Sequence, residues 1–553
     1  MSDAQELTIE IRGMTCNHCE RSVTKALESV PGITEVREVS YADGLARVVA
    51  GPETKDDRIE AAVSKAGYRA LVARQPGGDG PAIVATRADE FDLVIVGGGS
   101  AAFAAAIKGA DLGARIAVVE GGTLGGTCVN VGCVPSKALI RAAEAQHRRS
   151  HHPFAGIPST NGVVDWQAVL AQKDALVNQL RQMKYRDVLR SYEAVTLFEQ
   201  RAVFSGDRNV QLDDGRTLRG NKIIVATGAE AQAPPIPGLA EAGHLDNVSA
   251  MALEQIPKSL IVIGAGFIAV ELGQMFARLG VAVTLIARQN RVLTREDPAI
   301  GSALADYLRG EGIDVRTETA VRRVDRAGRY RVQVIHNGAA ETLESDQLLV
   351  ATGRRARTSG FGLDTLGVAL GKKGEIKVDD HLETSVPGVY AAGDVIGEPM
   401  FVYVAAYGGA LAAENALTGN MRRVDLTAVP SVTFTDPAVA TVGLTEAEAR
   451  VRGLEPLVSV LPMEHVARSL AARDTRGFVK LVADATTRKI LGAQILASEA
   501  GEMIMEPALA IKFGLAIEDI TSTFHPYLTL SEAIKLAAQT FDKDVGKLSC
   551  CAA

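Results

Sequence analysis

Two glycine-rich turns, each directly after an apolar run, constrain the fold of this chain more than any other feature. Residues 97–102 read Gly-Gly-Gly-Ser-Ala-Ala, after a run that ends at Val96. Residues 264–269 read Gly-Ala-Gly-Phe-Ile-Ala, after a run that ends at Ile263. Glycines at this spacing allow a tight strand-to-helix turn and let a dinucleotide pyrophosphate approach the helix N-terminus. The sequence therefore predicts two Rossmann-like domains, with fingerprints formed by Gly97, Gly99 and Ala102 and by Gly264, Gly266 and Ala269.

The residue that ends the second strand of each domain indicates which dinucleotide binds there. Glu120 follows the apolar run 114–119, where a carboxylate can accept a hydrogen bond from a ribose 2′-OH. Arg288 follows the run 282–286, at the place where an NAD-binding domain usually carries an acid. Because a guanidinium pairs well with a 2′-phosphate, the second domain is predicted to bind NADPH.

Two cysteines lie between the first fingerprint and a predicted helix. Residues 125–137 read Gly-Gly-Thr-Cys-Val-Asn-Val-Gly-Cys-Val-Pro-Ser-Lys. Because Pro is well tolerated in a first helical turn, a helix is predicted to start at Pro135, which places Cys133 near its N-terminus. Free N–H groups and the helix dipole there favour a reactive thiolate. On a regular helix the step from Cys128 to Cys133 turns through roughly 140°, so a bridge needs irregular backbone, which Asn130 and Gly132 permit. Structural disulfides are rare in cytosolic proteins, which favours a redox-active pair.

The N-terminal segment forms a separate predicted module. Its strands and helices follow the order βαββαβ over residues 7–73, which is the ferredoxin-like arrangement. Cys16 and Cys19 lie on a loop that reads Gly-Met-Thr-Cys-Asn-His-Cys, and the Cys-x-x-Cys spacing alone fits either a redox motif or a metal clip. The whole motif closely resembles that of the heavy-metal-associated domain, whose two thiolates suit a soft cation such as Cu(I) or Hg(II). His18 between them is interpreted as an exposed loop residue.

Charge and cysteine distribution narrow the function further. The 553 residues carry a formal net charge of −7, which argues against nonspecific nucleic-acid binding. The N-terminus is polar and acidic, and no apolar run reaches the length of a membrane span, so we expect a cytoplasmic protein without membrane insertion. The six cysteines fall as three close pairs, the last being Cys550 and Cys551, which suggests metal binding or redox chemistry.

The redox stretch resembles the active site of the flavin-dependent pyridine nucleotide–disulfide oxidoreductases, and the resemblance extends over residues 91–548. It implies bound FAD and a homodimer. It also implies that Cys133 contacts the flavin as a charge-transfer thiolate, that Cys128 meets the substrate, and that Lys137 pairs with Glu271 beside the flavin. Further cofactor-binding positions implied by the resemblance are Thr127, Gly228 and Asp394.

One departure from the family pattern bears on the substrate. Disulfide-reducing members carry a catalytic His near the C-terminus, where it moves protons to and from leaving thiols. When the chains are aligned on Thr-Leu-Ser-Glu, that position holds Tyr527, and His525 lies two residues out of register. Together with Tyr185 and the outer cysteine pairs, Tyr527 resembles the pattern of the family branch that reduces Hg(II).

This resemblance implies that NADPH and FAD deliver two electrons to Hg(II), which arrives as thiol complexes and is held by cysteine thiolates. The N-terminal module and the partner subunit's C-terminal tail would pass the ion to the inner pair. The implied metal ligands are Cys16, Cys19, Cys128, Cys133, Cys550 and Cys551.

Two other functions remain open. Some large thioredoxin reductases also end in adjacent cysteines, although the missing catalytic His and the metal-type module oppose that reading. A metal-trafficking protein that delivers Cu(I) would leave both fingerprints and the redox pair without a role.

The predicted architecture is α/β with α+β parts. The expected domains are a heavy-metal-associated domain (1–73), a flexible linker rich in Pro and Gly (74–90), an FAD-binding domain in two segments (91–250 and 353–427), an NADPH-binding domain (251–352) and an α+β dimerisation domain with a Cys-Cys tail (428–553).

Overall fold

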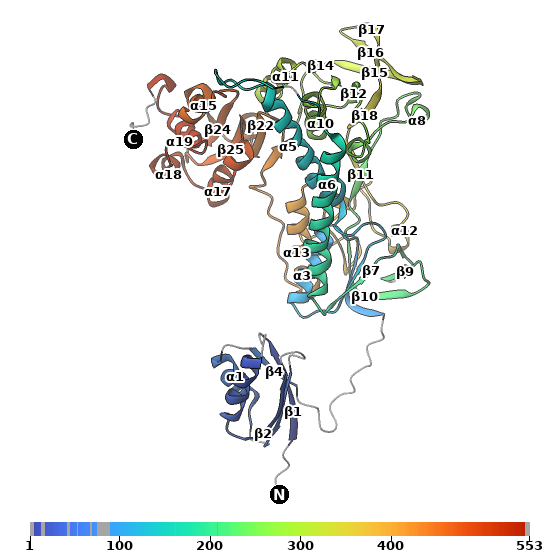
Figure 1. The fold of residues 1–553 in the computed structure, drawn as a ribbon, viewed down its shortest axis with the longest axis vertical. Helices are drawn as coiled ribbons and strands as arrows, with labels where there is room; N and C mark the ends of the chain where they lie inside the picture. The colour runs from blue at the N-terminus through green and yellow to red at the C-terminus, as the bar shows by residue number, and fades with distance from the viewer. Residues whose placement is uncertain are drawn as a thin grey trace. The chain divides into compact units, whose positions relative to one another are not determined.

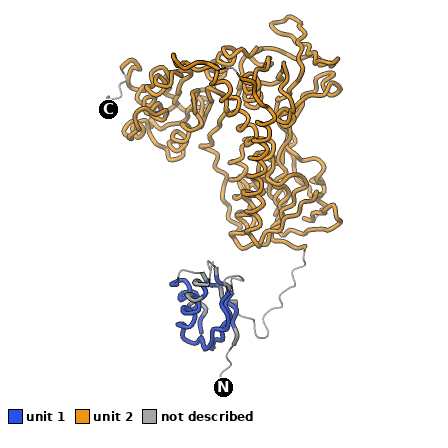
Figure 2. Tube along the Cα trace, viewed as in Figure 1, with its two compact units in different colours: residues 1–87 blue, residues 88–553 orange. Residues whose placement is uncertain are grey.

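The computed structural model divides into two compact units, residues 1–87 and 88–553 (Figure 2). The borders predicted within the second unit stay predictions. No helix in the described parts of the chain combines the length and the apolar character needed to cross a bilayer. The structure describes residues 5–12, 17–40, 45–51, 54–66, 69–73, 89–160, 162–206 and 208–547.

The first unit is a four-stranded antiparallel sheet in the order β2-β3-β1-β4, with two helices (Figure 1). Val23 and Leu27 lie on one face of the first helix and are buried, and Val30, two residues after the end of the helix, is buried too. The predicted ferredoxin-like order is confirmed, but the first helix begins at Asn17, so Cys19 belongs to its first turn and not to the preceding loop. The elements are β1 (Gln5–Arg12), α1 (Asn17–Glu28), β2 (Ile33–Ser40), β3 (Leu45–Ala50), α2 (Asp56–Lys65) and β4 (Arg69–Ala73).

The second unit is built on a sheet whose central strands, β7-β6-β5-β10-β20, are parallel. Strands β5 and β6 are mostly apolar and buried, as expected for strands that are covered on both faces. Helices α3 and α13 run side by side (Figure 1), and a Cβ at Gly409 of α13 would lie 2.0 Å from the carbonyl oxygen of Ala101. The main elements are β5 (Glu90–Val96), α3 (Ser100–Asp111), β6 (Ile116–Val119), α4 (Gly126–Val131), α5 (Cys133–Ser150), α6 (Trp166–Arg181), a π-helical turn (Gln182–Arg186), α7 (Asp187–Arg190), β7 (Val195–Phe198), β8 (Ala202–Phe204), β9 (Asn209–Leu212), β10 (Thr217–Val225), β20 (Val389–Ala391) and α13 (Val402–Thr418).

A second parallel sheet, β14-β13-β12-β18, is formed by the part of the chain between β10 and β20. Asp297 caps helix α11 by accepting a hydrogen bond from the N–H of Ala299 (2.9 Å), with Pro298 in the first helical position. The elements are β12 (Ser259–Ile263), α10 (Phe267–Arg278), β13 (Ala282–Ile286), α11 (Pro298–Gly310), β14 (Asp314–Arg316), the antiparallel strands β15 (Thr319–Ala327), β16 (Arg329–His336) and β17 (Ala339–Ser345), and β18 (Gln347–Val350).

The C-terminal region is a five-stranded antiparallel sheet in the order β21-β22-β25-β24-β23, covered by helices. It confirms the predicted α+β part of the fold. The elements are β21 (Ser431–Thr433), β22 (Ala438–Gly443), α14 (Glu446–Val451), β23 (Pro456–Pro462), α15 (Ala467–Ala472), β24 (Phe478–Asp484), β25 (Ile490–Ala497), α16 (Ala500–Met503), α17 (Met505–Phe513), α18 (Ile517–Ser522) and α19 (Glu532–Gln539).

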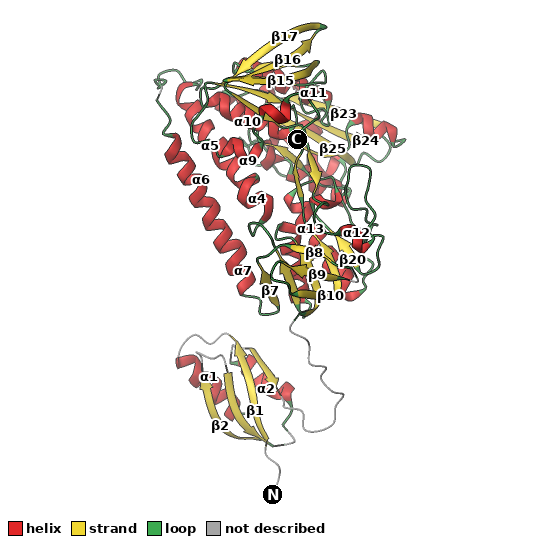
Figure 3. Ribbon diagram, turned by 90° about the vertical axis from the view of Figure 1, so that its right-hand side faces the viewer, coloured by secondary structure: helices red, strands yellow, loops and turns green. Residues whose placement is uncertain are grey.

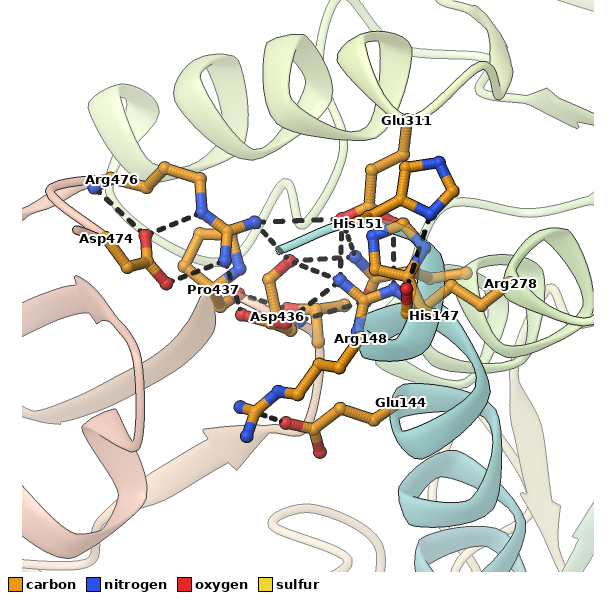
Figure 4. A network of polar contacts seen from close by, with 12 residues as sticks. Glu144, His147, Arg148, His151, Arg278, Glu311, Asp436, Pro437, Asp474 and Arg476 are labelled. Carbon is orange, nitrogen blue, oxygen red and sulfur yellow. Dashed lines mark hydrogen bonds and ion pairs between the residues drawn. The ribbon is translucent and has the colours of Figure 1, made fainter. Parts of the chain in front are cut away.

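A buried ion-pair network joins the C-terminal region to α10 (Figure 4). The side chain of Arg278 is 4% exposed and lies 2.6 Å from Glu311 and 3.0 Å from Asp436. Arg476 approaches the other carboxylate oxygen of Asp436 at 2.7 Å. Each of these charges therefore has an opposite partner at the contact between the C-terminal region and α10.

Candidate active site

One cavity of about 830 Å³ is lined by most of the predicted cofactor-binding residues. It lies past the carboxyl ends of β5, β6, β10 and β20, where ligands bind in parallel α/β sheets. Both inner cysteines line it. The predicted cofactor residues that line it are Gly97, Gly99, Glu120, Thr127, Lys137, Gly228, Glu271 and Asp394.

The first fingerprint fits the pyrophosphate and ribose of FAD. Gly97 has φ +122°, and a Cβ there would lie 2.2 Å from the carbonyl oxygen of Ala226. A Cβ on Gly126 would lie 2.6 Å from Cα of Gly99, so two backbone segments form the cradle without side chains. The N-terminus of α3 opens onto the cradle, and there it offers free N–H groups to an anion. Ala102 is fully buried and does not line the cavity, because it packs α3 onto the sheet.

The acidic residues of this cavity lie where the sequence predicts. Glu120 follows β6 and accepts a hydrogen bond from the N–H of Gly122 at 2.6 Å. Asp394 follows β20, and burial raises the pKa of its carboxyl, an effect that the charge of Arg354 partly offsets. Their roles toward the ribose and the ribityl chain stay predictions.

The two inner cysteines belong to different helices. Cys128 lies in α4 and Cys133 is the first residue of α5, so the helix begins two residues before Pro135. Gly132 breaks the helix between them with φ −127° and ψ −110°. The break supplies the irregular backbone that the five-residue spacing requires.

The thiol of Cys133 is prepared to ionise. A hydrogen bond from the Cys128 thiol lowers the pKa of Cys133, burial opposes this effect and the charge of Lys137 reinforces it, and the resulting pKa is about 7. The same hydrogen bond and burial raise the pKa of Cys128, which therefore acts as the donor. Cys133 is exposed to the cavity and Cys128 is half-buried.

An ion pair connects the cysteine helix to the second fingerprint helix. Lys137 Nζ lies 2.8 Å from Glu271 Oε2, and the Glu271 side chain is 4% exposed. The predicted contact between these side chains is thus present. Phe434, which the sequence did not single out, donates its N–H to Glu271 Oε1 at 2.9 Å, and its ring centroid lies 4.5 Å from Lys137 Nζ.

Tyr185 lies near the two inner cysteines, and so does Tyr403, which the sequence did not single out. The Tyr185 ring lies edge-on to Phe103 with centroids 4.7 Å apart, and burial raises the pKa of its phenol, with smaller contributions from Cys128 and Cys133. Tyr403 donates a hydrogen bond to the carbonyl oxygen of Pro430. Burial and the charge of Cys133 raise the pKa of Tyr403 to about 12. No local motif marks Tyr403, because it comes from α13, far along the chain.

Tyr527 does not line the cavity of its own chain. It is 60% exposed, on the loop that precedes α19. His525 has a 5% exposed side chain that lies 2.8 Å from Glu506 Oε1 through Nε2 and 3.0 Å from the carbonyl oxygen of Thr523 through Nδ1. His525 therefore anchors this loop.

The second fingerprint repeats the close approach of the first. A Cβ at Gly264 would lie 2.3 Å from the carbonyl oxygen of Ala351, and Ala269 is fully buried under α10. Arg288 is exposed just past β13, as a ligand for a 2′-phosphate requires. Nearby, Arg291 donates a hydrogen bond to the carbonyl oxygen of Thr294 at 3.2 Å.

The side chains of the predicted outer metal ligands lie outside the described part of the chain. Cys16, Cys550 and Cys551 lie outside the described residues, and of Cys19 only the backbone position in α1 is described. Within the described ranges, no group of three or more His, Cys, Asp or Glu side chains could hold a metal ion.

Comparison with known sequences defines the class of protein. The pyridine nucleotide-disulphide oxidoreductase model matches residues 91–409, and the dimerisation domain of the same family matches residues 429–538. The heavy-metal-associated domain matches residues 8–69. The chain belongs to the pyridine nucleotide-disulphide oxidoreductase family. It is therefore an FAD- and NADPH-dependent oxidoreductase.

Its curated relatives are more specific. A mercuric reductase of Staphylococcus aureus is 44% identical over 98% of this chain and 98% of the relative. A mercuric reductase of Shigella flexneri is also 44% identical, over 99% of this chain and 100% of the relative. Among solved structures, a Cu(II) complex of the HOCl-induced flavoprotein disulfide reductase RclA of Escherichia coli is 30% identical, covers 80% of this chain and 98% of its own, and has a TM-score of 0.71.

Proposed function

We propose that this protein is an Hg(II) reductase that uses NADPH and FAD. The observation that carries the proposal is similarity to mercuric reductases along 98% of both chains, from the N-terminal module to the C-terminal region. The overall reaction consumes one NADPH and one Hg(II), and it yields NADP⁺, one proton and Hg(0).

The inner cysteines are the proposed site of metal capture. With a pKa of about 7, Cys133 is half ionised at neutral pH and can displace a small thiol from an incoming Hg(II) complex. Cys128 displaces the second thiol, and its proton leaves with that thiol. Each new Hg–S bond forms as one old Hg–S bond breaks. Two electrons then reduce Hg(II) to Hg(0), both bonds break, and the two sulfurs remain as thiolates.

FAD, when bound, carries electron pairs from NADPH to the metal site. The backbone of Gly97, Gly99 and Gly126 would hold its pyrophosphate, and Glu120 a ribose. Lys137 keeps a positive charge beside Cys133 because Glu271 and the Phe434 ring hold its ammonium group. The exposed Arg288 would hold the 2′-phosphate of NADPH.

The proposed active site is shared between the subunits of a homodimer. Phe513 of α17 is 70% exposed, and Phe524, on the loop between α18 and α19, is 97% exposed. Apolar side chains at this level of exposure mark an interaction surface. Tyr527 lies on the same loop, so a partner's cavity is its proposed place, with Cys550 and Cys551 of the partner subunit delivering Hg(II) there.

Cys16 and Cys19 are proposed to capture Hg(II) first. The domain borders that the sequence predicts are part of the same proposal. We also propose a cytoplasmic location, which the dependence on NADPH and on free thiolates supports.

The test is Hg(II)-dependent NADPH oxidation by the purified full chain in excess small thiol, with release of Hg(0) vapour measured in parallel. Cys133→Ala should abolish both signals. Oxidised thioredoxin and Cu(II), offered as alternative acceptors, should support little turnover. Turnover with thioredoxin and none with Hg(II) would identify a disulfide reductase instead.

A further inference from the structure

The two halves of the redox loop have separate supports. Cys133 belongs to α5, which the Lys137–Glu271 ion pair connects to α10. Cys128 belongs to α4, as does Asn130, which lies between the two cysteines in the sequence. Asn130 Nδ2 donates to the carbonyl oxygens of Thr123, Leu124 and Gly126, at 3.3, 3.0 and 2.9 Å. These hydrogen bonds therefore hold helix α4 and the turn before it together as one unit.

A cation from another helix completes the hydrogen bonds of Asn130. Arg181 Nε donates to Asn130 Oδ1 at 2.7 Å. Arg181 is the last residue of α6, which packs against α4 (Figure 3). A hydrogen bond from a guanidinium is stronger than one between neutral groups, so this contact holds α4 firmly against α6.

The turn directly after Arg181 carries Tyr185. The backbone N–H of Asp187 bonds to the carbonyl oxygen of Gln182, and Gln182 Nε2 donates to Asp187 Oδ1 at 2.6 Å. Both bonds span five residues, and such π-helical turns occur frequently at functional sites. A Cβ at Gly125 would lie 3.6 Å from Tyr185 Cδ2, so the phenol ring packs on the turn that Asn130 holds.

We propose that Arg181 is a positioning residue for metal reduction: through Asn130 it holds Cys128 and Tyr185 as one unit. Cys133 belongs to the other unit, and Gly132 is the joint between them. A disulfide needs sulfurs about 2.05 Å apart, whereas two thiolates that share a metal ion stand at roughly twice that separation. The loop adopts the first spacing in the oxidised enzyme and the second while the reduced pair holds Hg(II), and a fixed Cys128 unit keeps Tyr185 beside the sulfur in each.

This inference rests on the proposed Hg(II) reduction, and a double-mutant cycle tests it. Arg181→Met should lower kcat/KM for an Hg(II)–thiol complex about tenfold, as should Tyr185→Phe, with less than about a twofold further loss when both are combined. Arg181→Lys should restore part of the loss, because it keeps a cationic donor. The matched control is Lys184→Met, which removes an exposed cation from the same turn and should leave kcat/KM unchanged.

Reduction of the bound flavin by NADPH should proceed at the wild-type rate in every variant, because α10 is untouched. Losses that multiply in the double variant, or a wild-type kcat/KM in Arg181→Met, would overturn the inference. If Arg181→Met does not fold, Arg181→Gln, which keeps a donor without the charge, takes its place in the cycle. Absence of Hg(II)-dependent turnover in the wild-type chain would instead refute the proposed function.

Discussion

The hydrogen bond between the two inner thiols sets the pH at which Cys133 becomes reactive, and substitution of Cys128 isolates it. This bond is the largest cause of the low pKa of Cys133, which is about 7. A hydrogen bond to a charged group contributes about 1.5–3 kcal/mol. Its removal in Cys128→Ala should therefore raise the pKa of Cys133 by about one to two pH units. At pH 7 the thiolate fraction would fall from about one half to between one tenth and one hundredth.

The assay is the charge-transfer absorbance between the Cys133 thiolate and the flavin, titrated with pH in the reduced enzyme. Cys128→Ser is the matched control, because a hydroxyl can still donate to the thiolate. Its titration midpoint should stay closer to that of the wild type than the midpoint of Cys128→Ala. Equal midpoints in the Ala and Ser variants would refute the assignment and leave the charge of Lys137 and the helix N-terminus as the causes.

Three further predictions concern the cofactor sites and the fold. Gly97→Ala should weaken FAD retention at least about tenfold, because its Cβ would meet the carbonyl oxygen of Ala226. Gly113→Ala, also at positive φ but with no atom within 4 Å of its Cβ, should retain FAD, and flavin absorbance after gel filtration measures both variants. Arg278→Met should lower the free energy of unfolding by about 3–5 kcal/mol in urea titrations, because it removes the buried charge that pairs with Glu311 at 2.6 Å, while Asp436 keeps Arg476; a loss below about 1 kcal/mol would contradict this. Arg288→Ala should raise KM for NADPH about tenfold and leave KM for NADH unchanged, and an equal rise for both would remove Arg288 from the 2′-phosphate site.

Local motifs predicted the parts of the site that depend on backbone shape. The fingerprints predicted the cradle at Gly97 because only glycine permits that approach to Ala226, and this requirement is visible in the sequence. The start of α5 was predicted to within two residues because Pro135 favours a first helical turn. The irregular backbone at Gly132 followed from the five-residue spacing of the cysteines.

The sequence could not predict the contacts between segments that are far apart in the chain. Phe434 reaches Lys137 and Glu271 only because the C-terminal region docks on α10, and no pattern around residue 434 indicates this. Tyr403 approaches Cys133 for a similar reason, since α13 packs against α3 only late in the chain. Arg181 looks like an ordinary helix residue until its partner Asn130 is known.

The strand order of the flavin sheet has a consequence for synthesis on the ribosome. Strand β20 pairs with β10 through Val389 and Ile223, yet the whole second parallel sheet is translated between them. At about 5–20 residues per second, the roughly 160 intervening residues take on the order of 8–30 seconds to appear. During that interval the edge of β10 at residues 223–225 waits for its partner strand and is open to mispairing with other chains. The small N-terminal unit, by contrast, is complete before β5 emerges, so a nascent chain can fold its metal-type module long before it can close its flavin site.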